Sequence, residues 1–352
     1  MLGSLFVLGI FHVGYDDQIF KRQRYGGISR YFSALAVGLP SRAVDVSSFS
    51  SPFFRFSVYS TPAIPQILHP TFYGGSPYRL RPEQSLVSTL FDMTPERFPD
   101  QFFLPQFRSP HSNKFSWLKA SNSIISISAA SADDLSFYVP NFSVPISIIH
   151  LATNIHHLDP VAPLLLNQPF FLMVGKRYAY KNGLLLLRAY ALLIAKTTKT
   201  ISLPLLIFAG GGPLNHNEKK FINDNGLNSL VLVLEVSDSN LAWLYLNSLA
   251  VLIPSLSEGF SLPVIEALVC NAALVVSDIE VHREIAADFA TCISPFNTAL
   301  WAEALASAAI AEPQKPQQSL GIRRYQQLCS YYSLPRMLDQ HLDFYTSCLK
   351  PV

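Results

Sequence analysis

The sequence predicts two α/β domains whose parallel sheets face one another across a cleft. Short apolar segments alternate with helix-like segments along both halves of the chain, which is typical of βαβ units in a parallel sheet. The segment Ala152–Gln168, which contains Pro160 and Pro163, interrupts this alternation and has the composition of a linker. With 352 residues, the chain is long enough for two domains that each have a hydrophobic core.

Buried parallel strands appear in a sequence as short, continuous apolar runs. Such runs lie in the first half at Ser4–Ile10, Leu86–Leu90, Ser123–Ser128 and Ile146–Ile149. In the second half they lie at Phe170–Val174, Leu205–Ala209, Leu230–Leu234, Ala250–Ile253 and Ala273–Val276. We predict helices between them, at Ser29–Leu39, Gly183–Ala195, Asn240–Leu249, Val264–Leu268 and Trp301–Ala311. The segment Ser47–Pro82 lacks helical periodicity, so we predict loops and irregular crossovers there.

The composition excludes one class of partner and leaves others open. The formal net charge is +2, and the Lys and Arg residues are scattered, so nucleic acid is not an expected partner. Only 14% of the residues are charged, against roughly 25% in an average soluble protein. This low charge fits either a poorly soluble protein or one that works beside a membrane or a protein partner.

Cysteine usage and hydropathy bear on where the protein works. The cysteines form no Cys-x-x-Cys pair and are expected to be free thiols in a reducing compartment. They are Cys270, Cys292, Cys329 and Cys348. No segment reaches the ~18–20 unbroken apolar residues of a membrane helix. The opening run Leu2–Phe11 lacks the basic start and cleavage site of a signal peptide. We expect a cytoplasmic protein, with association at the inner face of the membrane left open.

The strongest candidate site is the segment Pro254–Ala267, which follows a predicted strand and opens a predicted helix. Gly259 lets a ligand approach the backbone, and Pro263 suits a first helical turn. The N–H groups at such a helix start favour an anion. Glu258 and Glu266 could then bind hydroxyl pairs on either side of a diphosphate. A loop Glu and a solvated helix Glu explain the same residues equally well.

A second candidate lies at Gly175–Gly183, again between a predicted strand and a predicted helix. Arg177 and Lys181 could neutralise a diphosphate and the charge that develops on it. The alternative is a pair of surface cations whose stems lie along apolar surface. Because both cations coincide with a strand-to-helix turn, we favour the functional interpretation.

Glycine-rich loops form a third set of candidates. Gly26 and Gly27 precede the first long predicted helix, where backbone N–H groups can face an anion. An ordinary loop is an equally good explanation. Gly210–Gly212 is more consistent with a tight turn. The chain contains no Asp-x-Asp pair to hold a divalent metal on a diphosphate, so no metal site is predicted.

Together these motifs resemble glycosyltransferase family 4. Glu258 and Glu266 match the paired glutamates of that family, and Arg177 and Lys181 resemble its donor-diphosphate cations. The resemblance extends from about residue 16 to residue 295 and is strongest in the second half. It is unusually close to the subgroup with an N-terminal Gly-Gly-Ile-Ser-Arg-Tyr motif, which begins here at Gly26.

Further short segments also fit the family. They are His69–Tyr73, Ser126–Ser128, Ser237–Asp238, Leu241 and Tyr245.

The resemblance implies a B-type fold with two Rossmann-like domains. Residues 1–155 would form the acceptor-side domain, and a C-terminal helix within residues 333–352 would pack back on it. Residues 165–330 would bind the nucleotide sugar, through Gly259, Phe260 and Ser261 together with the glutamates and cations named above.

The implied activity is a retaining, metal-independent transfer of a sugar from a nucleotide-diphosphate donor to a glycan or lipid-linked acceptor. The expected pathway is cell-surface polysaccharide synthesis. The nucleotide sugar would be a substrate, and no separate cofactor is expected. Glu258, Arg177 and Lys181 would be the catalytic residues.

Three positions depart from the family pattern. Phe91 stands where a His usually reaches the donor sugar, and Ser261 and Asn271 stand where Gly is usual. Phe91 and Ser261 motivate the alternative of a catalytically impaired homologue that binds nucleotide sugars. A dinucleotide-dependent oxidoreductase is disfavoured because no Gly-x-Gly-x-x-Gly follows the first predicted strand.

Overall fold

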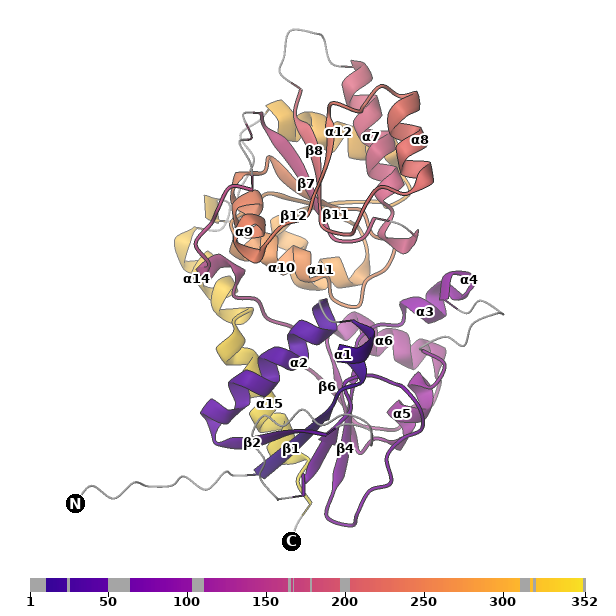
Figure 1. The fold of residues 1–352 in the computed structure, drawn as a ribbon, viewed down its shortest axis with the longest axis vertical. Coiled ribbons are helices and arrows are strands. Elements are labelled where there is room, and N and C mark those ends of the chain that lie inside the picture. Colours follow the sequence, from indigo (N-terminus) through magenta and orange to yellow (C-terminus); the bar gives the residue numbers. More distant parts are fainter. Residues whose placement is uncertain are drawn as a thin grey trace, which may run out of the picture. The chain divides into compact units, whose positions relative to one another are not determined.

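Parallel strands form both β-sheets in a computed structural model of the protein (Figure 1). The structure describes residues 11–23, 26–49, 64–102, 111–163, 166, 168–177, 179–196, 203–310, 317–318 and 321–350. The chain divides into two compact units: Met1–Leu151 with Leu334–Val352, and Ala152–Ser333. The predicted fold class, two Rossmann-like α/β domains on parallel sheets, is confirmed. The predicted strand Ser4–Ile10 lies outside the described residues.

The sheet of the first unit has the strand order β2-β1-β3-β4-β5-β6, and all its pairings are parallel. Its strands are β1 (Phe11–Asp16), β2 (Val44–Phe49), β3 (Ile67–His69), β4 (Ser85–Leu90), β5 (Ser123–Ser126) and β6 (Ile146–Ile148). Its helices are α1 (Gln18–Arg22), α2 (Gly27–Gly38), η1 (Leu39–Arg42), α3 (Thr94–Arg97), α4 (Pro99–Phe102), α5 (Lys114–Ala120), α6 (Ala129–Tyr138) and α15 (Leu334–Ser347).

Within the segment Ser47–Pro82, where irregular structure was expected, the end of β2 and the whole of β3 correct the prediction, and residues 50–63 lie outside the described part of the chain. Strand β3 has three residues and lies between Pro65 and Pro70, so no apolar run marks it in the sequence. Strand β1 was also missed, because His12 and Asp16 interrupt its apolar pattern although both are buried.

The sheet of the second unit has the order β12-β11-β10-β7-β8-β9, again with only parallel pairings. Its strands are β7 (Phe170–Val174), β8 (Leu205–Ala209), β9 (Val231–Leu234), β10 (Ala250–Ile253), β11 (Leu274–Ser277) and β12 (Ala290–Ile293). Its helices are η2 (Ile155–His157), η3 (Ala179–Lys181), α7 (Gly183–Lys196), α8 (His216–Asp224), α9 (Asp238–Asn247), α10 (Leu262–Val269), α11 (Glu280–Ala286), η4 (Ala287–Phe289), α12 (Thr298–Ile310) and α14 (Ile322–Tyr331).

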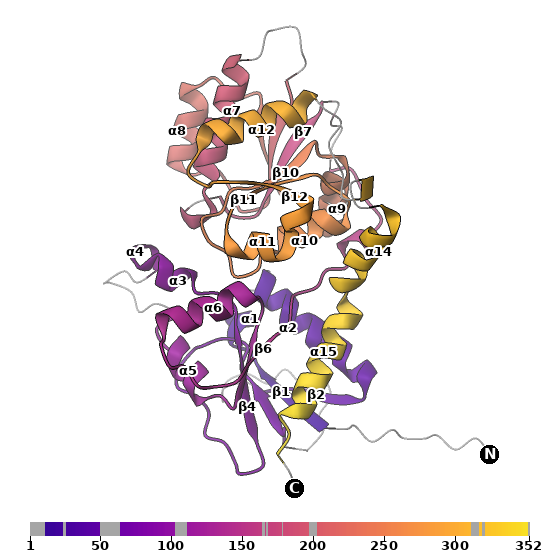
Figure 2. The same ribbon diagram turned by 180° about the vertical axis from the view of Figure 1, so that it is seen from behind.

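Helices cover both faces of the second sheet. Helices α7, α8 and α12 group on one face, and α9, α10 and α11 group on the other (Figure 2). Leu186 and Trp301 from the first group pack with Phe171 and Phe208 of the sheet in a fully buried cluster. Because β7, β8 and β10 are buried between the two helix layers, each is a continuous apolar run in the sequence, which is why these three strands were predictable.

Helix α15 belongs to the first unit although it follows the second in sequence. It packs on α2 and η1, and a Cβ atom at Gly38 would lie only 2.4 Å from Cδ1 of Leu338. Glycine at the end of α2 therefore allows the two helices to approach closely. Nearby, Arg42 Nε lies 2.9 Å from Asp339 Oδ1.

A buried polar network also joins α15 to the first sheet. His69 Nδ1 lies 2.7 Å from the Tyr345 hydroxyl, and His69 Nε2 lies 2.7 Å from Thr89 Oγ1. His341 Nδ1 donates to the Met337 carbonyl at 2.7 Å, so its Nε2 accepts from the Tyr31 hydroxyl at 2.7 Å. These pairs satisfy polar groups that would otherwise be costly to bury.

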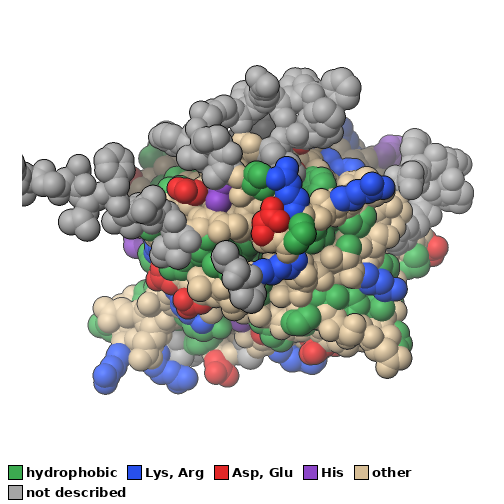
Figure 3. All heavy atoms as spheres, turned by 90° about the horizontal axis from the view of Figure 1, so that it is seen from below, with side chains coloured by type: hydrophobic (Ala, Val, Ile, Leu, Met, Phe, Trp, Pro, Cys, Tyr) green, Lys and Arg blue, Asp and Glu red, His purple; other side chains and the backbone are tan. Residues whose placement is uncertain are grey.

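Positive and negative side chains are interspersed on the face shown in Figure 3. No single-sign patch dominates this view, which agrees with the scattered Lys and Arg residues of the sequence. None of the helices in the described part of the chain combines the length and the apolar character needed to cross a membrane.

Candidate functional site

The strand order of the second unit marks where a ligand should bind. The chain runs outward from β7 to β8 and β9 on one side, and from β10 to β11 and β12 on the other. In open parallel sheets, ligands bind at the carboxyl ends of the two strands where this direction reverses. Here these strands are β7 and β10, which pair directly. We call the place where the direction reverses the switch point of the sheet. The loops that follow β7 and β10 are residues 175–182 and 254–261.

An ion pair joins these two loops. Lys181 Nζ lies 2.6 Å from Glu258 Oε1 and 2.7 Å from Oε2, and Ser255 Oγ donates to Oε1 at 2.7 Å. The Glu258 side chain is 8% exposed and that of Lys181 is 25% exposed. The Leu256 N–H also donates to the Tyr180 carbonyl at 2.7 Å. The structure thus brings together two residues that the sequence assigned to one site, with the ammonium still accessible to solvent.

Arg177 has different partners. Its Nε lies 3.2 Å from Glu218 Oε1, and its terminal nitrogens donate to the carbonyls of Gly210, Gly212 and Pro213 at 2.7–3.0 Å. The side chain is 3% exposed. The guanidinium therefore binds the loop after β8, where a Cβ atom at Gly211 would lie 2.2 Å from the Gly175 carbonyl oxygen. These contacts differ from the expected one, in which Arg177 and Lys181 act side by side on a diphosphate.

Helix α10 begins at the switch point and supplies the remaining predicted residues. Pro263 occupies its first turn, and Ser261 is its N-cap, with φ 76° and ψ 75°. Glu266 is buried one turn inside, where its Oε2 accepts a hydrogen bond from the Tyr245 hydroxyl at 2.8 Å. Phe260 is buried and its ring meets that of Tyr332 edge-on, 6.3 Å between centroids. The N-terminal end of α10 is thus fixed beside Glu258.

Sequence reasoning missed two residues near this site. Glu218 holds Arg177 and also closes the capping box of α8, because its Oε2 accepts from the Asn215 N–H at 2.8 Å. His282 is fully buried in α11, and its Nδ1 donates to the Ser277 carbonyl at 2.8 Å. Burial lowers the pKa of His282, and the charge of Glu258 opposes this shift. The Asn-x-x-Glu pattern was a visible signal for Glu218, whereas His282 resembles any other residue of an amphipathic helix.

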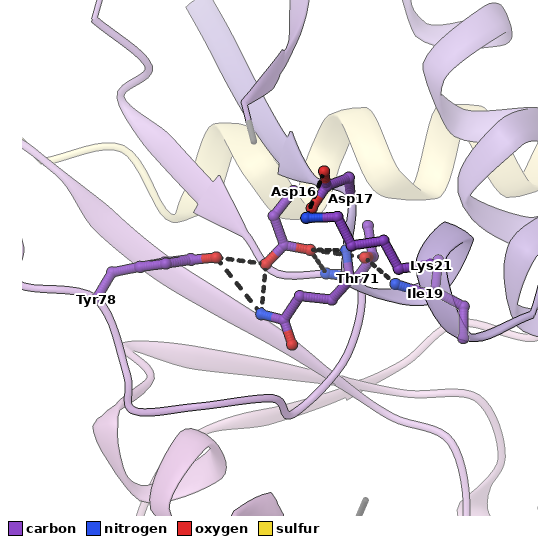
Figure 4. A network of polar contacts seen from close by, with 7 residues as sticks. Asp16, Asp17, Ile19, Lys21, Thr71 and Tyr78 are labelled. Atoms are coloured by element: carbon purple, nitrogen blue, oxygen red, sulfur yellow. Dashed lines mark hydrogen bonds and ion pairs between the residues drawn. The ribbon is translucent and has the colours of Figure 1, made fainter. Parts of the chain in front are cut away.

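The first unit has its own switch point, between β1 and β3. Asp16, at the end of β1, is buried there (Figure 4). Its Oδ1 accepts from the Thr71 N–H at 2.8 Å and from the Thr71 hydroxyl at 2.6 Å, and its Oδ2 accepts from Tyr78 at 2.6 Å. Burial raises the pKa of Asp16, and these hydrogen bonds oppose the shift. Asp16 therefore ties together the loops that follow β1 and β3.

The Gly pair and Phe91 also lie in the first unit. Gly26 is the N-cap of α2 in an extended conformation, and Gly27 is the first residue of that helix. The ring of Phe91 is 6% exposed and packs edge-on against Tyr31 and Phe32, with centroids 5.8 and 6.1 Å apart. Phe91 thus belongs to an aromatic cluster beneath α2.

The described residues offer no cluster of metal ligands. Within them, no group of three or more His, Cys, Asp or Glu side chains is placed to hold a metal ion.

Sequence comparison finds a similarity to a known family within the second unit. Residues 158–325 match the model of the glycosyl transferases group 1. The O-antigen chain mannosyltransferase RfbU of Salmonella typhimurium is 31% identical over 137 residues. That alignment covers 39% of this chain and 37% of the relative, so the chain spans about a third of the curated relative that it matches.

Solved structures share the fold across nearly the whole chain. Sucrose-phosphate synthase from Thermosynechococcus elongatus superposes with a TM-score of 0.70 at 14% identity, covering 96% of this chain and 98% of that one. A glycosyltransferase from Rickettsia africae gives a TM-score of 0.67 at 15% identity, with coverage of 97% and 99%. Anabaena HepE, solved in complex with UDP and glucose, gives 0.65 at 14% identity, with coverage of 96% and 100%. These comparisons support the predicted enzyme class, a glycosyltransferase: residues 158–325 are similar to the glycosyl transferases group 1, and the fold is the two-domain glycosyltransferase B type.

Proposed function

We propose that this protein is a retaining glycosyltransferase that moves a sugar from a nucleotide-diphosphate donor to a glycan or lipid-linked acceptor. The observation that carries the proposal is the Lys181–Glu258 ion pair, which joins the two switch-point loops at the N-terminus of α10. A diphosphate bound there would meet an accessible ammonium and the positive end of a helix dipole.

In this proposal each residue of the site contacts the donor or shapes the loop that does. Lys181 and the first turn of α10 stabilise the negative charge on the departing diphosphate. Glu258 holds hydroxyls of the transferred sugar, once Lys181 turns from the carboxylate to the phosphate. Glu266 holds the ribose hydroxyls with the carboxylate that Tyr245 orients. Gly259 and Phe260 shape the loop between them.

We assign Arg177 an indirect part. Its nitrogens are directed at Glu218 and at the carbonyls of the loop after β8. Arg177 would therefore position that loop beside the donor, and Lys181 would supply the charge that touches the phosphates.

The relatives support a proposal for the acceptor and the biological setting. The curated relative is an O-antigen chain mannosyltransferase, so we propose mannose as the first sugar to test and cell-surface polysaccharide as the product. Gly26 and Gly27, at the start of α2, stay candidates for binding the nucleotide sugar through their backbone N–H groups. We further propose that transfer needs no metal and no separate cofactor, and occurs in the cytoplasm at the inner face of the membrane.

A donor screen tests the proposal directly. The full chain is incubated with GDP-mannose and with UDP-sugars, and binding is followed by the thermal shift of unfolding, with and without EDTA. Transfer is followed as release of the nucleoside diphosphate in the presence of lipid-linked glycan acceptors. Binding with turnover supports the enzyme, binding without turnover supports an impaired homologue, and binding of no donor rejects both.

Lys181→Ala then tests the site. Removal of this charge should lower kcat/KM by a factor that corresponds to a loss of about 2–4 kcal/mol of transition-state stabilisation. The matched control is Lys220→Ala, which removes a lysine from an exposed ion pair with Asp224 on α8. Equal activity of the two variants would remove Lys181 from the mechanism.

A further inference from the structure

A pocket of about 360 Å³ lies on the second unit. Helix α11 and η4 line one side of it, and helix α14 with the following Tyr332 lines the other. Among the described residues that line it, none belongs to loop 175–182 or loop 254–261, so the pocket is separate from the switch point. Its volume is within the range of roughly 300–1,000 Å³ that is typical of pockets for small molecules.

The deeper lining residues are apolar or aromatic. Ile285, Leu328 and Tyr332 are at most 8% exposed, and we call them the floor of the pocket. The Tyr332 hydroxyl donates to the Ile285 carbonyl at 3.2 Å, which joins the two sides. The Tyr325 hydroxyl donates to the Val269 carbonyl at 2.6 Å and fixes α14 on α10. The protein's own contacts therefore hold both sides in place, as in a preformed small-molecule site.

Polar side chains surround this floor. Arg324, Gln327 and Asp288 line the pocket and are exposed. Within the described part of the chain, none of the three forms a hydrogen bond or an ion pair. Arg324 and Gln327 are three residues apart on α14, and Tyr331 follows one turn later, so their side chains lie on one face of that helix. Both sides of the pocket thus offer hydrogen-bonding groups to a ligand.

The charges around the pocket balance. Two arginines and two carboxylates line it: Arg283, Arg324, Glu284 and Asp288. The Nε of Arg283 also lies 2.6 Å from a carboxylate outside the lining. A phosphate or a nucleotide would be favoured by an excess of positive charge, which this set of residues does not have. Gln327 adds a neutral group that both donates and accepts. These residues suit a ligand that is uncharged and carries several hydroxyl groups.

We propose that this pocket binds a sugar ring of a neutral glycan and is a second carbohydrate site, apart from the site of transfer. Hydroxyl groups of the sugar bind Arg324, Gln327 and Asp288, which offer both donors and acceptors. The C–H face of the sugar packs on the floor and on the ring of Tyr331, which is 41% exposed. The inference rests on the proposed function for the source of the glycan, a polysaccharide acceptor. Holding a distant part of that acceptor raises the effective concentration of its end at the transfer site.

Helix α14 supplies matched controls. Arg323 precedes Arg324 and Gln326 precedes Gln327. All four side chains are exposed, but only the second residue of each pair lines the pocket. The two alanine substitutions in a pair remove the same side chain from the same helix, so their effects on stability should be similar. A difference in glycan binding then reports on the pocket.

The probes are mannotriose and maltotriose, titrated into the full-length chain and followed by ligand-observed NMR. Arg324→Ala and Gln327→Ala should each weaken binding of the better probe about fivefold, the effect of one lost hydrogen bond. Arg323→Ala and Gln326→Ala should leave its affinity within about twofold of wild type. Saturating GDP or UDP should not displace the probe, and Lys181→Ala should bind it as wild type does.

A transfer assay gives a second readout. With a long polysaccharide acceptor, Gln327→Ala should raise KM about fivefold without changing kcat. With a short acceptor that cannot reach the pocket, KM should be unchanged. An equal change of KM for both lengths would overturn the inference, because Gln327 would then not act through a distant part of the glycan.

The outcomes separate this inference from the function on which it rests. The inference is wrong if neither probe binds wild type, if the two members of each pair behave alike, or if a nucleotide displaces the probe. The proposed function survives each of these results, because the donor screen does not depend on this pocket. If the probe binds with the expected losses but no donor binds, the proposed function fails and the glycan site stands. Melting temperatures of all variants show whether each is folded.

Discussion

Lys181 donates to both carboxylate oxygens of Glu258, at 2.6 and 2.7 Å, and thereby closes one switch-point loop on the other. In this pair the ammonium of one loop neutralises the carboxylate of the other. A nucleotide diphosphate that takes Lys181 must therefore compete with Glu258. This competition gives the two residues opposite effects on binding.

Glu258→Gln should tighten the binding of the nucleoside diphosphate while slowing transfer. The amide cannot neutralise Lys181, so the ammonium is released to the phosphate, but the contact with sugar hydroxyls weakens. Loss of the part-buried pair should also lower the free energy of unfolding by about 1–3 kcal/mol. Calorimetric titration and a transfer assay measure the two effects. The control is Asp224→Asn, which breaks an exposed ion pair on α8 and should lower the free energy of unfolding by less than about 0.5 kcal/mol. Weaker diphosphate binding in Glu258→Gln would contradict the competition.

Arg177→Lys should destabilise the second unit by about 3–5 kcal/mol, although it conserves the charge. A lysine cannot reach Glu218 and the carbonyls of the loop after β8 at the same time, as the guanidinium does. Urea unfolding gives the change in free energy. The control is Arg283→Lys, at a 55% exposed arginine that pairs with Asp278, where we expect almost no change. A similar, small effect in both variants would show that the contacts of Arg177 contribute little.

Phe91→His should lower stability by about 1–3 kcal/mol without accelerating transfer. The imidazole would be buried against the rings of Tyr31 and Phe32, which pack edge-on with Phe91. Phe137→His is the control, since that ring is 78% exposed. Chemical denaturation and a transfer assay with a hexose donor are both needed. A several-fold rise in turnover would instead place position 91 at the reacting sugar.

Acid should destabilise the first unit through His341. Burial lowers its pKa from 6.5 to about 4, so the neutral ring is favoured in the folded state. Below pH 6.5 the unfolded chain binds a proton that the folded protein does not, so stability falls as the pH decreases towards 4. At pH 5.5 protonation of this single group should lower the free energy of unfolding by about 1 kcal/mol relative to pH 7.5.

The matched variant for the acid effect is His341→Gln, which keeps an acceptor for Tyr31 but does not titrate. Its loss of stability between pH 7.5 and 5.5 should be smaller than that of wild type by this amount. An identical pH dependence would show that His341 does not contribute. His69 remains in both proteins, and its pKa is lowered by burial and by His341, so His341→Gln also relieves part of the lowering at His69 and acts in the same direction.

The sequence predicted those strands that are continuous apolar runs. Phe170–Val174, Leu205–Ala209 and Ala250–Ile253 coincide with β7, β8 and β10, because helices bury both faces of these strands. Strand β12 (Ala290–Ile293) was missed because it is a partly exposed edge strand with a mixed sequence. Such strands are defined by their neighbour in the sheet, and no local pattern marks them.

The same limit applies to the site. Lys181 and Glu258 were assigned together only through the family resemblance; the structure brings them together because each follows a strand, and carboxyl ends of parallel strands meet at one edge. The partners of Arg177 could not be predicted, because Glu218 is reached only through the packing of α8 against the loop after β8. Ser261 and Asn271 have a left-handed backbone. The sole sign of this in the sequence was that the family usually has glycine at both positions.

Helix α15 has a consequence for how the protein is made on the ribosome. The second unit is one continuous stretch of chain, so all of it is available before α15 is synthesised. The buried hydroxyl of Tyr345 and ring of His341, by contrast, complete a network whose other members were synthesised about three hundred residues earlier. Until α15 is synthesised, Tyr15, Tyr31 and His69 lack the partners that Tyr345 and His341 supply, so the first unit begins first on the ribosome but is completed last.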